Sequence, residues 1–501
     1  MASLTSNRAS RGLALLAALL ALSVYLRTLA PTITWKHDGA DSGDLASAAF
    51  TFGIPHPPGY PLFTPLAGLF AHLPAFEPAS GIGLMVALAA AAAVYVLARA
   101  GCGLLSPFRS IPATVILPPV AALGFAFAPA IWSKATIVEV YTLNLLFASI
   151  VLWAIVSDHP RRVPIAALAF GLGLAHHLTI ALLLPGALVA LSPGRRDLKW
   201  LPLLVAPLLF YLYLPLRARA DPPVNWGDPR SLDGFLWVVT AGPYRGYLLA
   251  EGASDVVARI AYTARLLFEQ FTAPGIAVAL WGMARLFDAR RRLWGGLALA
   301  ALALTFYSIA YAAKDSFEYL IPVYAIVLLW LVYGAADVMS QFARPAVQYV
   351  LAGLVLLLPV FNLLAHFPAM DLSSDREAFN YAEQAIGSAP SGAVLFADGD
   401  QAVFALTYYR YVSEAGRSNV LILSPTLLDL DWYYLEQARR LPDLALPAAT
   451  ALSGGVKREE EIAKAAFAAG RPVCFDRSSP LLSEFDYDPE GSLQCAISTG
   501  E

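Results

Sequence analysis

Long apolar segments recur along the first 370 residues of the chain, separated by short polar stretches. Each has roughly the 20 residues that an α-helix needs to cross the hydrocarbon core of a bilayer, and together they predict about eleven membrane-spanning helices. We place them near residues 12–29, 81–98, 111–130, 141–156, 163–177, 178–193, 200–216, 272–287, 294–311, 320–335 and 347–366. The two segments that meet at residue 177 require a tight turn between them.

The charged residues between these segments predict the orientation of the chain. With the N-terminus in the cytoplasm, each loop assigned to the cytoplasm is basic, as the positive-inside rule requires. The basic residues of these loops are Arg99, Arg109, Arg161, Arg162, Arg195, Arg196, Lys199, Arg285, Arg290, Arg291, Arg292 and Arg344. The alternate loops contain acids such as Asp41, Glu139 and Asp315. We therefore expect the acidic loops and everything after the last span to lie outside the cytoplasm.

Residues 371–501 differ from the rest of the chain in both pattern and charge. Apolar runs at 393–397 and 420–423 have the length of short buried strands, and the stretches 376–386, 432–440 and 457–468 have helical spacing. The segment holds 20 acidic and 10 basic residues, although the whole chain carries a net charge of only −3. These features predict a transmembrane domain over residues 1–370 and a small α/β domain over residues 371–501, periplasmic or otherwise extracytoplasmic.

Composition supports lipid as the main solvent. The chain is 58% hydrophobic and 14% charged, and its mean hydropathy is +0.60. The first apolar run follows two arginines, as in a signal peptide, but no small-residue cleavage site follows it, so we expect an uncleaved first span. Cys474 and Cys495 form a disulfide if the C-terminal segment lies in an oxidising compartment, and two free thiols fit the sequence equally well.

The first outer loop, residues 30–62, carries the densest group of ionisable residues. It contains the run DSGD from Asp41 to Asp44 and the run HPPGYP from His56 to Pro61. Asp41 and Asp44 share one face if a helix begins near Ser42, for which Asp41 or Ser42 is a suitable cap. One interpretation is a capped interfacial helix followed by a proline-stiffened turn. The other is catalytic, because ionisable groups beside a membrane are costly and tend to be functional, and a carboxylate there can serve as a general base.

Two further outer segments contain candidate residues. Lys134, Glu139 and Tyr141 form either a surface ion pair beside an interfacial aromatic residue or a group that faces the first loop. His176 and His177 lie at an outer helix end, and adjacent residues on a helix point in different directions, so they are weak evidence for a metal site. We expect one of them to have a structural partner and the other to contact a phosphate.

Arginines on the outer face depart from the charge rule and need an explanation. Arg217 ends the segment at 200–216, and Arg245 follows the run NWGDP from Asn225 to Pro229. These side chains either extend to lipid headgroups or hold a phosphate, for which the planar guanidinium group is suited. Lys314 adds a cation to the same site or belongs to a charged turn. The acidic run Asp398-Gly399-Asp400 is interpreted as a turn rather than a metal site.

No motif of a soluble enzyme competes with these segments. The chain contains no phosphate-binding glycine loop, no zinc-ligand spacing of cysteine and histidine, and no nucleophile elbow. It also lacks the basic patch that a nucleic-acid-binding protein needs.

The two runs of the first loop resemble those of the membrane family that includes transmembrane protein 260, an O-mannosyltransferase of the GT-C glycosyltransferase class. The hallmark of that family is an Asp-Ser-Gly-Glu/Asp run ahead of a His-Pro-Pro-Gly-Tyr-Pro run. This chain has Asp44 where glutamate is common. The segments Glu139-Val140-Tyr141 and Asn225 to Pro229 also match. The resemblance covers roughly residues 12–370, is specific in the first 60 residues and is loose in the C-terminal segment.

The resemblance implies a GT-C fold, a polyprenyl-phosphate-linked sugar donor and an acidic catalyst in the first outer loop. Asp41 or Asp44 would take the proton of the acceptor hydroxyl, with the other aspartate orienting it, and the anomeric configuration would be inverted. Lys134, Arg217 or Arg245 would stabilise charge on the departing polyprenyl phosphate. The residues implied in binding donor or acceptor are His56, Tyr60, Lys134, Glu139, Tyr141, His176, His177, Arg217, Trp226, Asp228 and Arg245.

We therefore expect a multi-pass glycosyltransferase of the cytoplasmic (inner) membrane that moves mannose or a similar hexose to a hydroxyl group. The acceptor would be a protein, a cell-envelope glycan or a lipid, and the partners would be the bilayer, the lipid-linked donor and that acceptor, with no nucleic acid. No metal ligands are predicted, and a need for a divalent metal is left open. The alternative is a transporter or flippase of a lipid-linked or small anionic substrate, which places ionisable residues near span centres. Their concentration in outer loops favours the enzyme.

Overall fold

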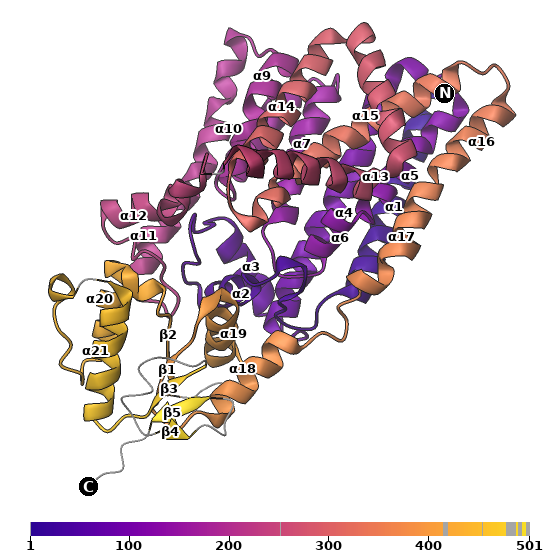
Figure 1. Ribbon diagram of the computed structural model, residues 1–501. Coiled ribbons are helices and arrows are strands. Elements are labelled where there is room, and N and C mark those ends of the chain that lie inside the picture. The colour runs from indigo at the N-terminus through magenta and orange to yellow at the C-terminus, as the bar shows by residue number, and fades with distance from the viewer. Residues whose placement is uncertain are drawn as a thin grey trace.

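The apolar segments form a tall bundle of helices with a small β-sheet at one end, and the N-terminus lies at the opposite end (Figure 1). The computed structural model describes residues 2–250, 252–413, 419–452, 454–476, 487–488 and 493–496. The helices of the bundle are α1 (Ala2–Thr28), α4 (Pro78–Leu104), α5 (Leu117–Ala126), α6 (Pro129–Ala135), α7 (Tyr141–Val156), α8 (Arg162–Leu174), α9 (Leu184–Leu191), α10 (Leu201–Val205), α11 (Tyr213–Ala218), α13 (Ala253–Ala289), α14 (Arg291–Ala310), α15 (Ile321–Ser340), α16 (Pro345–Val355) and α17 (Leu357–Met370).

Shorter helices lie in the polar connections. They are α2 (Ser42–Thr51), α3 (Phe63–Ala71), α12 (Leu232–Val239) and the 3₁₀ segments η4 (Leu178–Leu183), η7 (Gly242–Tyr247) and η8 (Lys314–Leu320). Helices α2 and α3 belong to the first loop and its exit, and in Figure 1 they lie at the end of the bundle that faces the sheet. The loop with the catalytic candidates therefore lies between the bundle and the C-terminal segment.

The helices agree in position with the predicted spans. Within the described residues, seven helical segments are long and apolar enough to cross a membrane, or up to eight if the bent pair Pro112–Ala126 and Pro129–Ala135 is one span. Shorter apolar helices at Tyr141–Val156, Arg162–Leu174 and Leu178–Leu191 lie where the sequence predicts the remaining spans. Every predicted segment thus coincides with a helix or a helix pair, while the number of bilayer crossings stays a prediction.

Burial distinguishes central spans from peripheral ones. In the span that contains α15, 94% of the residues in the most apolar stretch are buried inside the protein, compared with 17% for α16 and α17. A helix that is apolar on all sides and enclosed by neighbours forms the centre of a bundle, whereas an apolar helix with an open face is placed to contact lipid. α15 is therefore central, and α16 with α17 lies at the periphery.

The C-terminal segment is an α/β unit, as the alternation of runs predicted. Its helices are α18 (Glu377–Ser388), α19 (Gly399–Val412), α20 (Asp431–Arg440) and α21 (Gly455–Ala468). Its strands are β1 (Val394–Phe396), β2 (Leu421–Leu423), β3 (Val473–Phe475), β4 (Tyr487–Asp488) and β5 (Gln494–Ala496), in the spatial order β2-β1-β3-β5-β4. The first three are parallel neighbours, and β5 and β4 are antiparallel. A disulfide joins Cys474 of β3 to Cys495 of β5, so the bonded alternative holds for this cysteine pair.

Both faces of the sheet are covered because successive strand residues point to opposite sides. Leu395 and Ile422 pack into the same buried cluster as α18, α19 and the transmembrane helices. Val394, Phe396 and Leu421 form a separate core with α20 and α21. One layer of the C-terminal unit is thereby continuous with the core of the bundle. This continuity brings α19 against the first loop.

Candidate active site

Helix α2 begins at Ser42, in agreement with the start expected from the sequence. The hydroxyl of Ser42 donates to the carbonyl oxygen of Thr34 at 2.9 Å and accepts from the Thr34 amide at 3.2 Å. Asp41 occupies the N-cap position, but its side chain makes no capping hydrogen bond. The first turn of α2 is therefore held by Ser42, and the Asp41 carboxylate stays available for another partner.

Asp44 is buried, and both of its carboxylate oxygens are occupied. Oδ2 accepts hydrogen bonds from the backbone amide of His56 at 2.9 Å and from its ring Nδ1 at 2.8 Å. Oδ1 accepts from the indole Nε1 of Trp226 at 3.0 Å. Three donors on one carboxylate leave it little capacity for a further hydrogen-bond donor. Asp44 therefore joins the two runs of the first loop to each other and to a distant segment.

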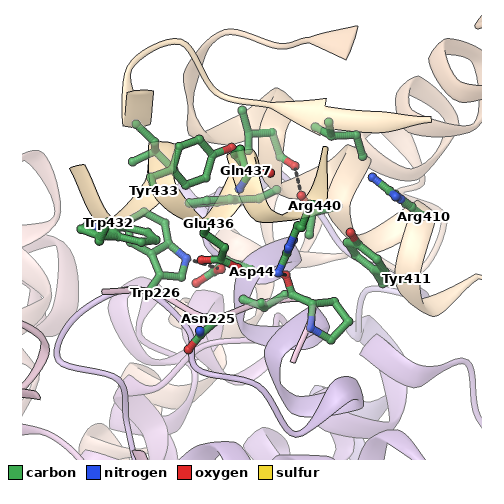
Figure 2. Close-up of a pocket in the computed structure, with 17 residues that line it drawn as sticks. Asp44, Asn225, Trp226, Arg410, Tyr411, Trp432, Tyr433, Glu436, Gln437 and Arg440 are labelled. Atoms are coloured by element: carbon green, nitrogen blue, oxygen red, sulfur yellow. Dashed lines mark hydrogen bonds and ion pairs between the residues drawn. The ribbon is translucent and has the colours of Figure 1, made fainter. Parts of the chain in front are cut away.

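Trp226 reaches Asp44 because its segment pairs with the first loop as a short parallel bridge. The amide of Ile54 donates to the carbonyl of Val224 at 2.8 Å, and the amide of Trp226 donates to the carbonyl of Ile54 at 3.1 Å. Asp44 and Trp226 line a small pocket of about 70 Å³. Figure 2 shows the bond between them, with Trp432 of α20 beside Trp226 and Glu436 of α20 near Asp44. The C-terminal unit thus closes the site behind Asp44.

His56 links the two aspartates of the first loop. Its Nε2 lies 3.7 Å from Oδ2 of Asp41 and 3.2 Å from the hydroxyl of Tyr60. Burial lowers the pKa of His56, but the carboxylates of Asp41 and Asp44 outweigh burial and raise this pKa to about 9. His56 is therefore a cation at neutral pH, held between Asp44 on one side and Asp41 with Tyr60 on the other.

A cavity of about 520 Å³ lies above this group. Six of the predicted site residues line it: Asp41, His56, Tyr60, Glu139, Tyr141 and His177. The side chain of Asp41 is 40% exposed, and its exposed part faces the cavity. Enclosure raises the pKa of Asp41, with the nearby His56 only partly offsetting the effect. Of Asp41 and Asp44, only Asp41 lines this cavity.

Glu139 and His177 supply buried polar groups at the wall of the cavity. Glu139 is 3% exposed, and burial raises the pKa of its carboxyl group against the opposing effect of Lys134. Nδ1 of His177 lies 2.8 Å from the hydroxyl of Thr179 and accepts from the Thr179 amide at 3.4 Å. The ring proton is then on Nε2, which has no partner among the described residues. This buried donor at the cavity is suited to a ligand oxygen.

The wall also contains residues that the sequence-based site did not include. They are Asp38, Tyr244, Tyr247, Tyr307, Tyr311, Asp315, Tyr319, Asp400 and Gln401. Lys314, which the sequence offered either as a cation of the same site or as part of a charged turn, lines the cavity as well. The rings of Tyr307 and Tyr311 are stacked at 5.4 Å, and Tyr319 lies 5.5 Å from Tyr307. Tyrosines are common at the ends of membrane spans, so their residue type alone does not mark a site. Their convergence on one cavity depends on how the spans pack, for which the sequence has no local signal.

Several predicted residues lie outside this cavity. Lys134 is 2% exposed, and its Nζ donates to the carbonyl of His37 at 2.6 Å and lies 3.2 Å from Glu318. His176 donates from Nε2 to the carbonyl of Val140 at 2.8 Å. Neither side chain lines the cavity, and both make their contacts with segments behind the cavity wall.

The outer arginines and Asp228 are engaged in structural contacts. Arg217 donates to the carbonyls of Phe52 and Thr51 at the end of α2, and Arg245 is exposed and bonded to Thr240. Neither lines the cavity, so a phosphate clamp by these two residues has no support in this geometry. Asp228 contacts Arg230 at 3.0 Å and Arg439 of α20 at 3.2 Å, and so ties the Trp226 segment to the C-terminal unit.

A second cavity of about 620 Å³ adjoins the first. Asp38 and Lys314 line both, and Nζ of Lys314 lies 2.6 Å from Oδ1 of Asp38. The second cavity is bordered by α13, through residues such as Arg259 and Gln270. Within the described part of the chain, no group of three or more His, Cys, Asp and Glu side chains is arranged to hold a metal ion.

Comparison with known proteins agrees with the motifs of the first loop. Residues 41–199 match the family model described as "Protein O-mannosyl-transferase TMEM260 N-terminal domain". The resemblance to this family is confirmed. A mouse (Mus musculus) protein named Protein O-mannosyl-transferase TMEM260 is 27% identical over 459 residues, which cover 82% of this chain and 62% of the relative. Its counterpart in Dictyostelium discoideum is 22% identical over 488 residues, covering 83% of this chain and 57% of the relative. The chain thus spans about three fifths of the length of these relatives.

Solved structures agree with the expected fold. The crystal structure of ArnT from Cupriavidus metallidurans bound to undecaprenyl phosphate matches with a TM-score of 0.61 and 14% identity, over 97% of this chain and 98% of that one. The apo structure of the same protein matches with a TM-score of 0.56 and 13% identity, over 96% and 97%. The protein is therefore a multi-pass membrane protein with the GT-C fold and a small C-terminal sheet, as the sequence led us to expect.

Proposed function

We propose that this protein is a membrane glycosyltransferase that transfers a hexosyl group from a polyprenyl-phosphate-linked donor to a hydroxyl of a protein acceptor. The observation that carries the proposal is the difference in surroundings between Asp41 and Asp44. Asp44 is saturated by His56 and Trp226, whereas Asp41 faces a cavity of about 520 Å³ beside a cationic histidine. A site that holds one carboxylate in place and leaves the other open to substrate has the parts of a general base and its support.

In the proposed reaction Asp41 accepts the proton of the acceptor hydroxyl as its oxygen attacks the anomeric carbon. The new glycosidic C–O bond forms while the bond from that carbon to the phosphate oxygen breaks. The electron pair of the broken bond leaves with the polyprenyl phosphate, and attack from the opposite face inverts the anomeric configuration. A base with a raised pKa suits this role because it binds the abstracted proton more firmly.

Lys314 is the cation best placed to stabilise the departing phosphate. It lines the cavity and is 89% exposed, paired only with Asp38. Lys134 lies behind the same wall, where its charge is balanced by Glu318. A lysine that a phosphate can approach stabilises charge developing on the leaving group without a proton transfer. Lys314 thus takes the role of stabilising the departing phosphate, for which the sequence also offered Arg217 and Arg245.

The remaining wall is suited to a sugar ring. The tyrosine rings offer flat apolar faces, and their hydroxyls offer hydrogen bonds, a combination that fits a pyranose with its C–H and O–H groups. Nε2 of His177 provides a buried donor at the same wall. The names of the relatives support mannose and protein as donor sugar and acceptor. The undecaprenyl phosphate named for the ArnT structure supports a lipid-phosphate carrier. Reaction at the outer face of the cytoplasmic membrane is part of the proposal.

The test is transfer of radiolabelled mannose from synthetic polyprenyl-phosphate mannose to Ser- and Thr-containing peptides, using full-length protein in proteoliposomes. We expect transfer by the wild type, and a kcat about 10²- to 10⁴-fold lower for Asp41→Asn, the usual contribution of a general base. Asp158→Asn, which changes a carboxylate outside the site, is the matched control. Full activity of Asp41→Asn would exclude Asp41 as the base, and no labelled product from any hexose donor in the wild type would exclude the proposed reaction.

A further inference from the structure

The acidic turn at residues 398–400 reaches the cavity of the candidate active site, a position that the sequence alone does not indicate. Asp400 lies in the first turn of α19 and lines the same cavity as Asp41, although 359 positions separate them in the chain. Gln401 lines it as well. Among the described residues, these two are the contribution of the C-terminal segment to the cavity wall. The C-terminal unit is thus part of the site in addition to covering it.

The position of Asp400 is set by close contact between α19 and α2. A β-carbon on Gly43 would lie 2.5 Å from the carbonyl oxygen of Phe404, so the two helix backbones meet directly. The indole of Trp35 in the first loop donates to the carbonyl of Gln401 at 3.1 Å. Further along α19, the hydroxyl of Tyr408 accepts from the amide of Ala79 at 3.1 Å. These contacts hold the start of α19 beside the start of α2.

Acidic residues outnumber cationic ones in the cavity wall. Its acidic residues are Asp38, Asp41, Glu139, Asp315 and Asp400, and its cationic residues are Lys314 and His56. The two cations already have partners, because Lys314 pairs with Asp38 and His56 bonds to Asp44. Asp400 has no hydrogen-bond or ion-pair partner among the described residues. An unpaired carboxylate at a protein-lined wall attracts a cation more strongly than one in bulk water.

The two substrates of the proposed reaction approach from different sides. A lipid-linked donor keeps its chain in the bilayer and reaches the cavity from the helical bundle. Asp400 belongs to α19, and in Figure 1 α19 lies at the end of the bundle near the sheet, where a water-soluble polypeptide acceptor would arrive. Asp400 and Lys314 line the same cavity, and Asp400 is the one carried by the C-terminal unit.

We propose that Asp400 is a specificity-determining residue that selects an acceptor segment carrying a lysine or arginine next to the hydroxyl that receives the sugar. This inference rests on the proposed transfer to a protein hydroxyl. The carboxylate pairs with the basic side chain of the acceptor and holds the neighbouring Ser or Thr hydroxyl near Asp41. An acceptor with acidic neighbours is repelled by the same group.

The test compares two fluorescent peptides of equal length, one with Ser flanked by lysines and one with Ser flanked by glutamates. Their binding to full-length protein in nanodiscs is measured by anisotropy, and sugar transfer to each is measured in parallel. We expect the wild type to bind the lysine peptide about three- to tenfold more tightly, a range typical of one accessible ion pair. The preference should appear in KM rather than kcat, and it should shrink at high salt.

Two variants and a control make the test specific to Asp400. Asp400→Asn, which keeps the size of the side chain, should remove most of the preference, and Asp400→Lys should reverse it toward the glutamate peptide. Glu383→Gln removes an exposed carboxylate from α18, away from the cavity, and should leave the preference unchanged. Equal binding of both peptides by the wild type, or an unchanged preference in Asp400→Asn, would overturn the inference. Charge-selective binding without any sugar transfer would contradict the proposed function and support the role of Asp400.

Discussion

The indole Nε1 of Trp226 donates a hydrogen bond to Oδ1 of Asp44 at 3.0 Å, across 182 positions of the chain. This bond occupies the one Asp44 oxygen that His56 does not use. Together with the two bonds from His56, it gives Asp44 three donors and leaves its carboxylate little capacity for an incoming hydroxyl. The remaining aspartate, Asp41, is the one that faces the cavity.

Trp226→Phe should lower both activity and stability. The change leaves Oδ1 of a buried carboxylate without its donor, which typically costs about 1–3 kcal/mol. It also loosens the support of His56 and hence of Asp41, so we expect kcat to fall about tenfold, equivalent to 1.4 kcal/mol in the barrier. The measurements are melting temperature in detergent and the kinetics of sugar transfer.

Trp281→Phe is the matched control for this prediction. Trp281 in α13 also donates to a carboxylate, Oδ2 of Asp337, at 3.0 Å, but far along the bundle from the cavity. It should affect stability and leave kcat near the wild-type value. Equal loss of kcat in the two variants would contradict the supporting role of Trp226.

The pH dependence of kcat should be bell-shaped. Asp41 must be ionised to accept a proton, so the rate falls as pH drops through its pKa, which burial raises above the ordinary carboxyl value near 4. His56 must be charged to hold the two aspartates, so the rate also falls as pH rises through its pKa of about 9. Because that pKa lies above the ordinary value near 6.5, the stabilising contribution of His56 is present below about pH 6.5 and is lost through pH 9.

His56→Gln tests the assignment of the two limbs. Removing the cation should abolish the alkaline limb and move the acidic limb to higher pH, since the pKa of Asp41 then rises further. An alkaline limb that persists unchanged in this variant would show that another group causes it.

Gly43→Ala should impair activity by separating α2 from α19. The new methyl group would lie 2.5 Å from the carbonyl oxygen of Phe404, closer than any ordinary contact, and the obstructing atom belongs to the backbone. We expect a loss of about 1–3 kcal/mol in stability, as for other overpacking changes, together with a higher KM for the acceptor.

The control for Gly43 is Gly353→Ala in α16, where a β-carbon meets nothing within 4 Å. That change should be neutral or slightly stabilising because alanine favours helix over glycine. If Gly43→Ala behaves in the same way, the contact between α2 and α19 does not constrain the site.

Loss of the disulfide should destabilise the C-terminal unit. Cys474 and Cys495 are separated by 21 positions, and releasing a loop of this size typically costs about 3 kcal/mol. Cys474→Ser and Cys495→Ser should each lower the melting temperature, and a reducing agent should lower that of the wild type alone. If a reducing agent lowers the melting temperatures of the wild type and of both variants equally, its effect does not come from this disulfide.

Much of the architecture could be predicted from the chain because it depends on local patterns. A helix in lipid must satisfy its own backbone hydrogen bonds, so each apolar run of sufficient length becomes helical almost wherever it lies. The alternation of short strands and helices after residue 371 similarly predicted the C-terminal unit. The runs at Asp41–Asp44 and His56–Pro61 marked the position of the candidate site along the chain.

The roles of individual residues depended instead on packing between distant segments. The sequence left Asp41 and Asp44 equivalent, and the bonds from His56 and Trp226 to Asp44 and the cavity beside Asp41 distinguish them. It offered Arg217 as one candidate to hold the phosphate, but the side chain is held by backbone carbonyls at the end of α2. It treated Asp400 as a turn residue, although α19 brings it to the cavity. Sequence by itself determined which segments are helical and where ionisable groups collect, because hydrophobic length and local charge decide both. Only the tertiary structure decided which of those groups meet, because contacts between residues hundreds of positions apart have no local signal.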